Sequence, residues 1–239
     1  MVVQHNMAAS NANRQLGIST NVLSKSTEKL SSGYRINRAA DDAAGLSISE
    51  KMRSQIRGLN KASSNAQDGI SAIQTAEGAL NEAHSILQRM NELATQAAND
   101  TNTTVDRNAI QSEINALTSE VSRIASTTQF NTQNLLDGTF SSKNLQVGAL
   151  NGQKIAIDID TMNAAALSVD ALCVSTFADA GKAMSAVQKA IEKVSKQRSS
   201  LGALQNRLEH TVNNLDNVAE NTQTAESRIR DTDMASEMV

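Results

Sequence analysis

The sequence has 239 residues and a formal net charge of −3, and 39% of its residues are apolar while only 2% are aromatic. It contains no proline and no tryptophan, a composition that suits long, thin helical bundles better than a compact globular core. The charge argues against nucleic acid as the main partner, and no uninterrupted run of about 18 apolar residues is present to span a membrane. The single cysteine, Cys173, excludes an internal disulfide.

The first predicted element is a helix over residues 6–29 with a thin apolar content. An isolated helix of that quality is marginal in water, so it needs a partner helix. Gly33 ends it, because glycine readily takes the left-handed conformation that closes a helix. Asp41 and Asp42 then offer N-cap oxygens to the next helix. The apolar residues of the first helix fall roughly on one side and are Met7, Ala8, Leu16, Val22, Leu23 and Leu30.

A second helix is predicted over residues 43–99, where apolar residues recur three or four positions apart without a break. At 1.5 Å per residue it is roughly 85 Å long, far more than a globular domain needs. Gly58, Gly69 and Gly78 each cost on the order of 1 kcal/mol relative to alanine, which predicts close approach of another backbone. The core positions are Met52, Ile56, Leu59, Ala62, Ala66, Ile70, Ile73, Ala76, Leu80, Ala83, Leu87, Met90, Ala94 and Ala97.

A third helix is predicted over residues 104–126, after a polar turn short enough to make it an antiparallel neighbour of the second. The last helix, over residues 180–230, carries a comparable apolar stripe and is nearly as long as the second. Two long helices joined through a distal region are most simply placed side by side and antiparallel, with both chain ends at the same end.

A β-hairpin is predicted between the third and last helices. The segments 144–147 and 154–159 alternate polar and apolar residues and flank an Asn151-Gly152 pair, which is typical of a hairpin turn. The side chains expected to face the helices are Leu145, Val147, Ile155, Ile157 and Ile159. These elements predict a mainly α fold, an elongated antiparallel helical bundle or coiled coil with a small β-hairpin region.

Several strings in the chain match those of bacterial flagellin in order and spacing. They are Glu28-Lys29-Leu30-Ser31-Ser32-Gly33, Arg35-Ile36-Asn37, Asp41-Asp42-Ala43-Ala44-Gly45-Leu46, Gln67-Asp68-Gly69-Ile70-Ser71, Gln74-Thr75-Ala76-Glu77-Gly78-Ala79-Leu80, Thr128-Gln129-Phe130-Asn131, Gly202-Ala203-Leu204-Gln205-Asn206-Arg207-Leu208 and Ala225-Glu226-Ser227-Arg228-Ile229-Arg230-Asp231. They cover nearly the whole chain, which therefore resembles flagellin, the filament protein of the bacterial flagellum.

The resemblance implies a structural subunit that polymerises with other flagellin subunits for motility, outside the cell, and that needs no cofactor. It implies export through the flagellar type III apparatus without a cleaved signal, consistent with the absence of a secretory signal pattern in residues 1–10, and assembly at the filament cap. The expected division is an N-terminal inner (axial) helix segment (1–34), a linker (35–42), the N-terminal part of the rod with the long helix, second helix and hairpin (43–178), the C-terminal long helix of the rod (179–231) and a truncated C-terminal inner segment (232–239).

Three departures from the usual flagellin pattern are expected to matter. The chain ends at Val239, whereas flagellins typically continue into an apolar terminal helix that pairs with the first helix, so we expect this form to assemble poorly. Only a short loop replaces the large variable outer domains that many flagellins carry. Cys173 is unusual for the family, and its apolar neighbours predict a small apolar residue rather than a reactive thiol.

The resemblance also implies recognition of the monomer by the innate receptor Toll-like receptor 5. The family's receptor-contact motif corresponds to Arg89, Leu93 and Glu113 in this chain, with Gln88, Glu92 and Gln96 nearby. Helical spacing places positions 89, 93 and 96 on a face offset from the core, so we expect them to be exposed together. Without the resemblance, the charged residues in this set are also typical of an ordinary solvated helix face.

Other functions are less well supported by the residues. The histidines, His5, His84 and His210, form no His-Glu-x-x-His zinc motif, no glycine-rich phosphate loop is present, and the sequence predicts no catalytic site, metal site or cofactor. A hook-filament junction protein of the same architecture is the closest alternative. A secreted coiled-coil adhesin is disfavoured because such coils usually keep stricter heptads.

Overall fold

The computed structural model describes residues 6–239, which form five helices and four short strands. The fold is mainly helical, as the sequence predicts. The chain divides into two compact units: residues up to Asn60 together with Asp216–Val239 form the first, and Lys61–Leu215 form the second. The two long helices, α2 (Ala43–Ala97) and α4 (Phe177–Arg230), each contribute one part to each unit.

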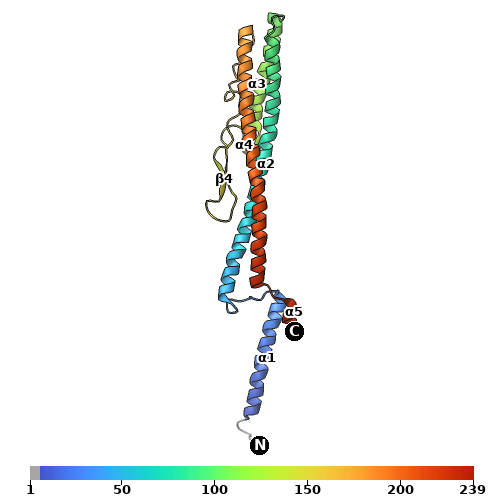
Figure 1. The fold of residues 1–239 in the computed structure, drawn as a ribbon, viewed down its shortest axis with the longest axis vertical. Helices are drawn as coiled ribbons and strands as arrows, with labels where there is room; N and C mark the ends of the chain where they lie inside the picture. Colours follow the sequence, from blue (N-terminus) through green and yellow to red (C-terminus); the bar gives the residue numbers. More distant parts are fainter. Residues whose placement is uncertain (1–5) are drawn as a thin grey trace. The chain divides into compact units, whose positions relative to one another are not determined.

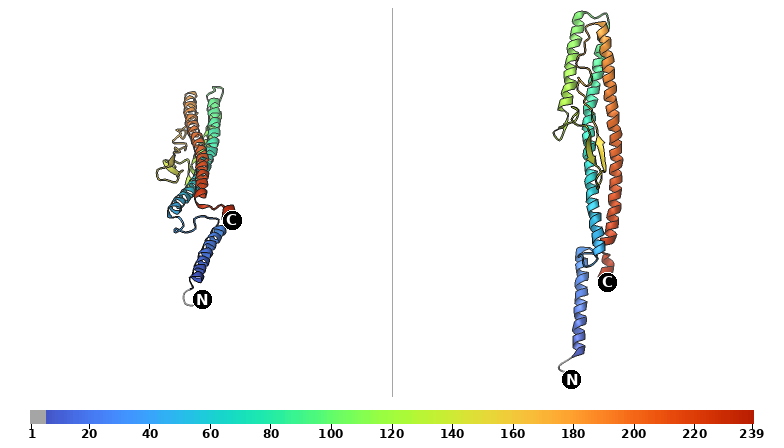
Figure 2. Two further views of the ribbon diagram at one scale, coloured as in Figure 1. Left: turned by 60° about the horizontal axis from the view of Figure 1, so that its bottom comes forward. Right: turned by 90° about the vertical axis from the view of Figure 1, so that its left-hand side faces the viewer.

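The second unit is built around three helical segments: residues 61–97 of α2, α3 (Thr104–Thr127) and residues 177–215 of α4. Figures 1 and 2 show these segments running alongside one another. Small and aliphatic side chains fill the space between them, which allows the helices to approach closely. The buried side chains include Ala76, Leu80, Leu87, Met90 and Ala94 of α2, Ile114 and Val121 of α3, and Val187, Ala190 and Val194 of α4.

Within this unit α2 and α4 are antiparallel, as predicted. Arg198 of α4 lies 3.7 Å from Glu77 of α2. Further along α2, the Thr95 hydroxyl donates to the Met184 sulfur at 3.3 Å. As the residue number rises along α2, the residue number of its partner in α4 falls, so the two helices run in opposite directions. Two helices with apolar stripes of similar length pack in this way when the intervening chain reverses direction.

The start of α3 is fixed by a capping box. The Thr103 hydroxyl oxygen accepts a hydrogen bond from the Asp106 backbone N–H, and the Asp106 carboxylate accepts one from the Thr103 backbone N–H at 2.9 Å. These reciprocal bonds satisfy backbone groups that the first turn of a helix leaves unpaired. Arg107 then donates to the Ala97 carbonyl oxygen at 3.2 Å, which ties α3 back to the end of α2.

The predicted hairpin is present as β3 (Lys143–Gln146) and β4 (Lys154–Ile157), paired antiparallel with Leu145 opposite Ile155. The Asn65 side-chain amide of α2 donates to the Gln146 carbonyl oxygen at 3.2 Å, which fixes the hairpin against that helix. Two further two-residue strands, β1 (Gln129–Phe130) and β2 (Gln133–Asn134), form a small turn that the sequence patterns did not predict.

The helix glycines only partly follow the prediction of close contact. A Cβ at Gly69 would overlap the Leu145 Cδ1 atom, so this site is crowded by a hairpin side chain rather than by another backbone. At Gly78 the prediction is wrong, because no heavy atom of another element lies within 4 Å of the position that a Cβ would take. Gly78 therefore carries the conformational cost of glycine without a packing reason.

The segment between β4 and α4 contributes to the core of the second unit. Residues 160–176 contain no regular strand or helix, but five of their apolar side chains, at irregular intervals along the segment, are buried in the core. The buried members are Met162, Ala164, Leu167, Val169 and Val174. The sequence predicted only a loop of mixed character here, because these side chains follow neither helical nor strand periodicity.

In the first unit, α1 (Met7–Ser32) ends where the sequence predicts, with Gly33 in the left-handed conformation at φ 73°. The Gly33 N–H donates to the Lys29 carbonyl oxygen at 2.8 Å, which closes the helix. A short helix, α5 (Met234–Met238), lies against the C-terminal part of α1, where Glu237 is 3.4 Å from Lys29. No residue of α1 is buried.

The two aspartates before α2 have different roles. The Asp42 carboxylate accepts a hydrogen bond from the Gly45 N–H at 2.9 Å, which is the predicted capping role. Asp41 instead accepts bonds from the backbone N–H groups of Arg38 and Asn37 and stabilises the linker before the helix. The bond from Arg38 is the main reason that the pKa of Asp41 lies below its ordinary value.

Candidate interaction surfaces

The residues predicted to bind a receptor gather where α2 and α3 meet. The Arg89 guanidinium donates to the Glu92 carboxylate at 3.1 Å along α2 and to the Glu113 carboxylate at 3.0 Å across to α3. Gln88 and Gln96 are exposed on the same helix. The structure thus brings five of the six predicted residues to one polar, solvent-facing surface, and the Arg89–Glu113 pair joins its two helices.

Leu93 is the exception, and the expectation that it is exposed with Arg89 and Gln96 is wrong. Only 2% of Leu93 is accessible, because its side chain packs into the core of the second unit. The sequence predicts both α3 and α4 as neighbours of α2, but its list of core positions omits Leu93, which the structure buries between them. The buried arc of α2 therefore extends past Leu87, Met90 and Ala94 to include Leu93.

The two carboxylates of this surface stabilise the positive charge of Arg89. Hydrogen bonds from Arg89 to Glu92 and Glu113 raise the pKa of the guanidinium above its ordinary value, so Arg89 is charged at any physiological pH. Half of the Arg89 side chain remains accessible, which leaves donor groups available to a partner. An arginine already held in one rotamer loses less entropy on binding than a free one.

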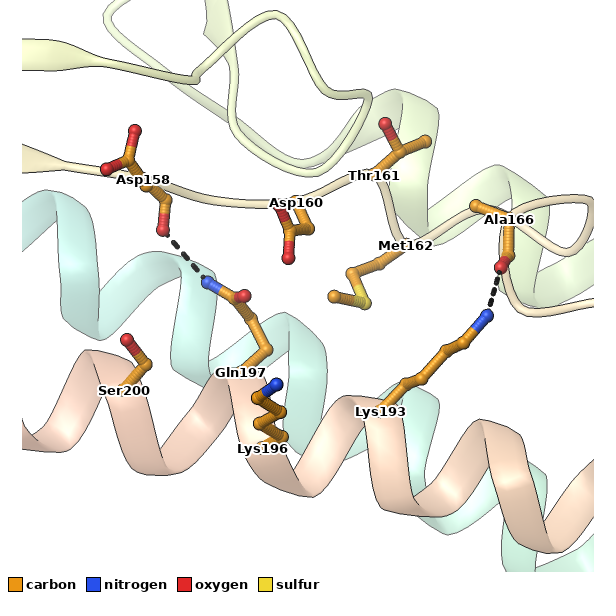
Figure 3. Close-up of a pocket in the computed structure, with 9 residues that line it drawn as sticks. All are labelled: Asp158, Asp160, Thr161, Met162, Ala166, Lys193, Lys196, Gln197 and Ser200. Atoms are coloured by element: carbon orange, nitrogen blue, oxygen red, sulfur yellow. Dashed lines mark hydrogen bonds between the residues drawn. The ribbon is translucent and has the colours of Figure 1, made fainter.

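A polar cavity of about 450 Å³ lies between α4 and the segment after β4, and Figure 3 shows the residues that line it. The buried Gln197 amide donates to the Asp158 carbonyl oxygen at 3.0 Å, and Lys193 donates to the Ala166 carbonyl oxygen at 3.0 Å. Both bonds go to backbone oxygens and hold residues 158–166 against α4. We therefore interpret the cavity as part of the scaffold; sequence reasoning identified none of its residues.

Several large apolar side chains of α1 are exposed to solvent. Leu16 and Leu23 are each 66% accessible, Ile18 is 51% accessible and Val22 is 59% accessible. At 100° per residue, Leu16 and Leu23 lie about 20° apart, while Ile18 and Val22 lie about 100° or more from them around the axis. The apolar residues of α1 therefore spread over about half of the helix circumference, where Leu16 with Leu23 and Ile18 with Val22 form two separate apolar strips.

Candidate catalytic residues do not converge in the described part of the chain. No group of three His, Cys, Asp or Glu side chains is arranged to hold a metal ion within residues 6–239. His84 lies half-buried with one ring nitrogen 3.1 Å from the Gln88 amide, His210 is exposed, and His5 lies outside the described residues. No helix among residues 6–239 is long and apolar enough to cross a membrane.

Cys173 differs from the expectation of a small apolar residue. Its thiol is exposed and lies 3.1 Å from the Ser175 hydroxyl. Hydrogen bonding to Ser175 lowers the pKa of the thiol below its ordinary value. In the sequence, the residue that indicates a polar environment for the thiol is Ser175, two positions away. The prediction used the apolar neighbours of Cys173 instead.

Comparison with known proteins agrees with the geometry. The bacterial flagellin N-terminal helical region matches residues 3–141, and the bacterial flagellin C-terminal helical region matches residues 184–239. Flagellin from Halalkalibacterium halodurans is 56% identical over 241 residues, covering 100% of this chain and 89% of its own.

Solved structures give a consistent result. Flagellin from Bacillus cereus superposes with a TM-score of 0.56 at 30% identity, over 64% of this chain and 88% of that one. A putative flagellar hook-associated protein from Vibrio parahaemolyticus gives a TM-score of 0.67 at 13% identity, over 80% of this chain and 100% of that one, which shows a shared fold alone. The chain therefore belongs to the bacterial flagellin family and is a structural subunit of the flagellar filament, not an enzyme.

Proposed function

In place of the expectation that this form assembles poorly, we propose that copies of this chain assemble into the filament through the two apolar strips of α1. The observation that supports this is the high exposure of Leu16, Ile18, Val22 and Leu23 in a helix with no buried residue. A helix with apolar residues on more than one side is stable when neighbours cover it on more than one side. A tube of subunits supplies such neighbours, whereas a single partner helix would cover one strip and leave the other in water.

Substitution in each strip tests this proposal. The chain is expressed in a bacterium that lacks its own flagellin, and filaments are measured by electron microscopy. We expect Leu16→Asp and Val22→Asp each to abolish or greatly shorten filaments, since a charge would be desolvated in the contact. Ser24→Asp, at an exposed polar position about 80° or more around the helix axis from all four apolar residues, is the matched control and should leave filament length unchanged. Normal filaments from both strip variants would refute the proposal.

The same proposal includes export of the chain through the flagellar type III apparatus and its addition at the filament cap, as the family implies. Strains that lack either component provide the test. Without the export apparatus the chain should stay inside the cell, and without the cap it should appear in the medium as unpolymerised protein. Filaments in either strain would contradict this part of the proposal.

We further propose that the monomer is a ligand of Toll-like receptor 5 through Gln88, Arg89, Glu92, Gln96 and Glu113. The supporting observation is the exposed Arg89 guanidinium, held by two carboxylates at the meeting line of two helices. Arginines preorganised in this way are typical binding hot spots, and truncation of a hot spot costs about 2 kcal/mol or more. In this arrangement Leu93 acts from the core, where it supports the backbone beneath Arg89 and Glu92.

Receptor binding by the purified monomer tests this assignment. Arg89→Asp is expected to weaken binding to the receptor ectodomain about 30-fold, in line with a loss of about 2 kcal/mol. Arg123→Asp is the matched control, because Arg123 is also an exposed arginine paired with a glutamate three residues away. Circular dichroism should be unchanged in both variants. Equal receptor affinities for Arg89→Asp and the wild-type chain would refute the assignment.

A further inference from the structure

An apolar cavity of about 360 Å³ opens between α2 and the base of the β3–β4 hairpin. Two of the three phenylalanines in the chain, Phe130 and Phe140, line it together with Leu145 and Ile157. Both phenylalanines are only partly buried, so aromatic surface that packs against the core on one side remains accessible on the other. A concave apolar surface of this kind favours the insertion of an apolar side chain.

The tip of the same hairpin presents such a side chain. Leu150 is 67% accessible and does not line the cavity of its own chain. Its backbone is held on both sides, because its N–H donates to the Gln153 side-chain oxygen at 3.0 Å and its carbonyl oxygen accepts from the Gln146 amide at 2.7 Å. The exposed leucine is therefore held in place before it meets a partner, which lowers the entropy cost of binding.

The charges near the tip and the cavity are complementary. Lys154 is exposed beside the tip, and residues 146–157 include no acidic residue. Two charged residues line the cavity: Asp68, which is exposed, and Lys143, whose ammonium lies 6.0 Å from the centroid of the Phe140 ring. Asp68 is therefore the group that can attract Lys154 of another copy. A hairpin tip that places Leu150 in the cavity of another copy brings a cationic segment to a rim that offers a carboxylate.

We propose that Leu150 of one copy inserts between Phe130, Phe140 and Leu145 of a neighbouring copy, with Lys154 of the first facing Asp68 of the second. The two surfaces are different, so the contact is heterologous and leaves a free tip at one end and a free cavity at the other. Contacts of that type extend into open chains rather than closed pairs. The inference rests on the proposed assembly of this chain into filaments and names one contact within them.

Photo-crosslinking in assembled filaments tests the contact directly. Benzoylphenylalanine is placed at position 150, and labelled subunits are mixed with ¹⁵N subunits so that crosslinks between copies are recognised by mass. We expect crosslinks from position 150 to peptides that contain Phe130 or Phe140 of another copy. Benzoylphenylalanine at Val105, which is 76% accessible in the same unit, is the matched control and should not label those peptides.

Filaments in which position 150 crosslinks elsewhere, or in which position 105 labels the cavity equally well, would overturn the contact while leaving filament assembly intact. A wild-type chain that forms no filament would instead refute the proposed function.

If the crosslinker itself prevents assembly, exchanging the two charges between positions 154 and 68 tests the contact. Lys154→Asp and Asp68→Lys should each lower the temperature at which filaments dissociate, and the double variant should restore it. A double variant no better than either single variant would overturn the contact.

Discussion

Replacing Gly78 with alanine is expected to stabilise the second unit, whereas the same change at Gly69 is not. Alanine in a helix interior is worth about 0.5–1 kcal/mol over glycine, and no heavy atom of another element lies within 4 Å of the new methyl group at position 78. At position 69 the methyl group would overlap Leu145 Cδ1, so the end of this half-buried side chain must turn away from its preferred rotamer, which costs about 0.5–1.5 kcal/mol and offsets the gain. Because the gain from replacing glycine is common to both positions, the free energies of unfolding of the two variants should differ by about 0.5–1.5 kcal/mol.

Urea and thermal unfolding followed by circular dichroism measure this difference. For a chain of this size, 1 kcal/mol moves the melting temperature by about 2–4 °C. In a Leu145→Ala background the overlap is removed, so Gly69→Ala should then stabilise nearly as much as Gly78→Ala. Two results would refute the reasoning: equal stabilisation by both alanines in the wild-type chain, or a deficit at position 69 that persists after Leu145 is shortened.

Three further outcomes follow from the described contacts. Leu87→Ala, which empties a fully buried site, should lower the free energy of unfolding by about 2–5 kcal/mol in urea titrations, while Val105→Ala at an exposed position should change it little. Asp106→Asn should lower the melting temperature at pH 7. Hydrogen bonds from Thr103 lower the pKa of this carboxyl in the folded state, so the stability that it contributes is fully present above the unfolded pKa near 3.9 and is lost as the pH falls through the folded pKa. The difference in melting temperature between variant and wild type should therefore shrink in that acidic range. A difference that stays constant with pH would contradict the assignment. Ser175→Ala should raise the pKa of Cys173 and move the pH midpoint of its maleimide labelling upward, and an unchanged midpoint would show that the hydroxyl does not stabilise the thiolate.

Features that depend on neighbours along the chain could be predicted from the residues alone. Apolar residues three or four positions apart identified α2 and α4, because one face of a long helix must be buried whatever covers it. Gly33 marked the end of α1 through its own backbone freedom, and Asn151-Gly152 marked the turn between β3 and β4 through its preference for a tight hairpin. The receptor-binding residues came from the resemblance to flagellin rather than from spacing.

Features that depend on segments far apart in the sequence became visible in the packed fold. Leu93 is buried because α3 and α4 both pack against α2, and helical spacing does not state how far around α2 the contact with two neighbours extends. Gly69 is crowded by Leu145, whereas Gly78 is open, although both stand in the same kind of helical sequence. The Arg89–Glu113 pair likewise exists because two helices meet there. Periodicity fixes which face of an element is apolar, but the packing of other elements against that face determines which residues are buried, paired or left accessible to a partner.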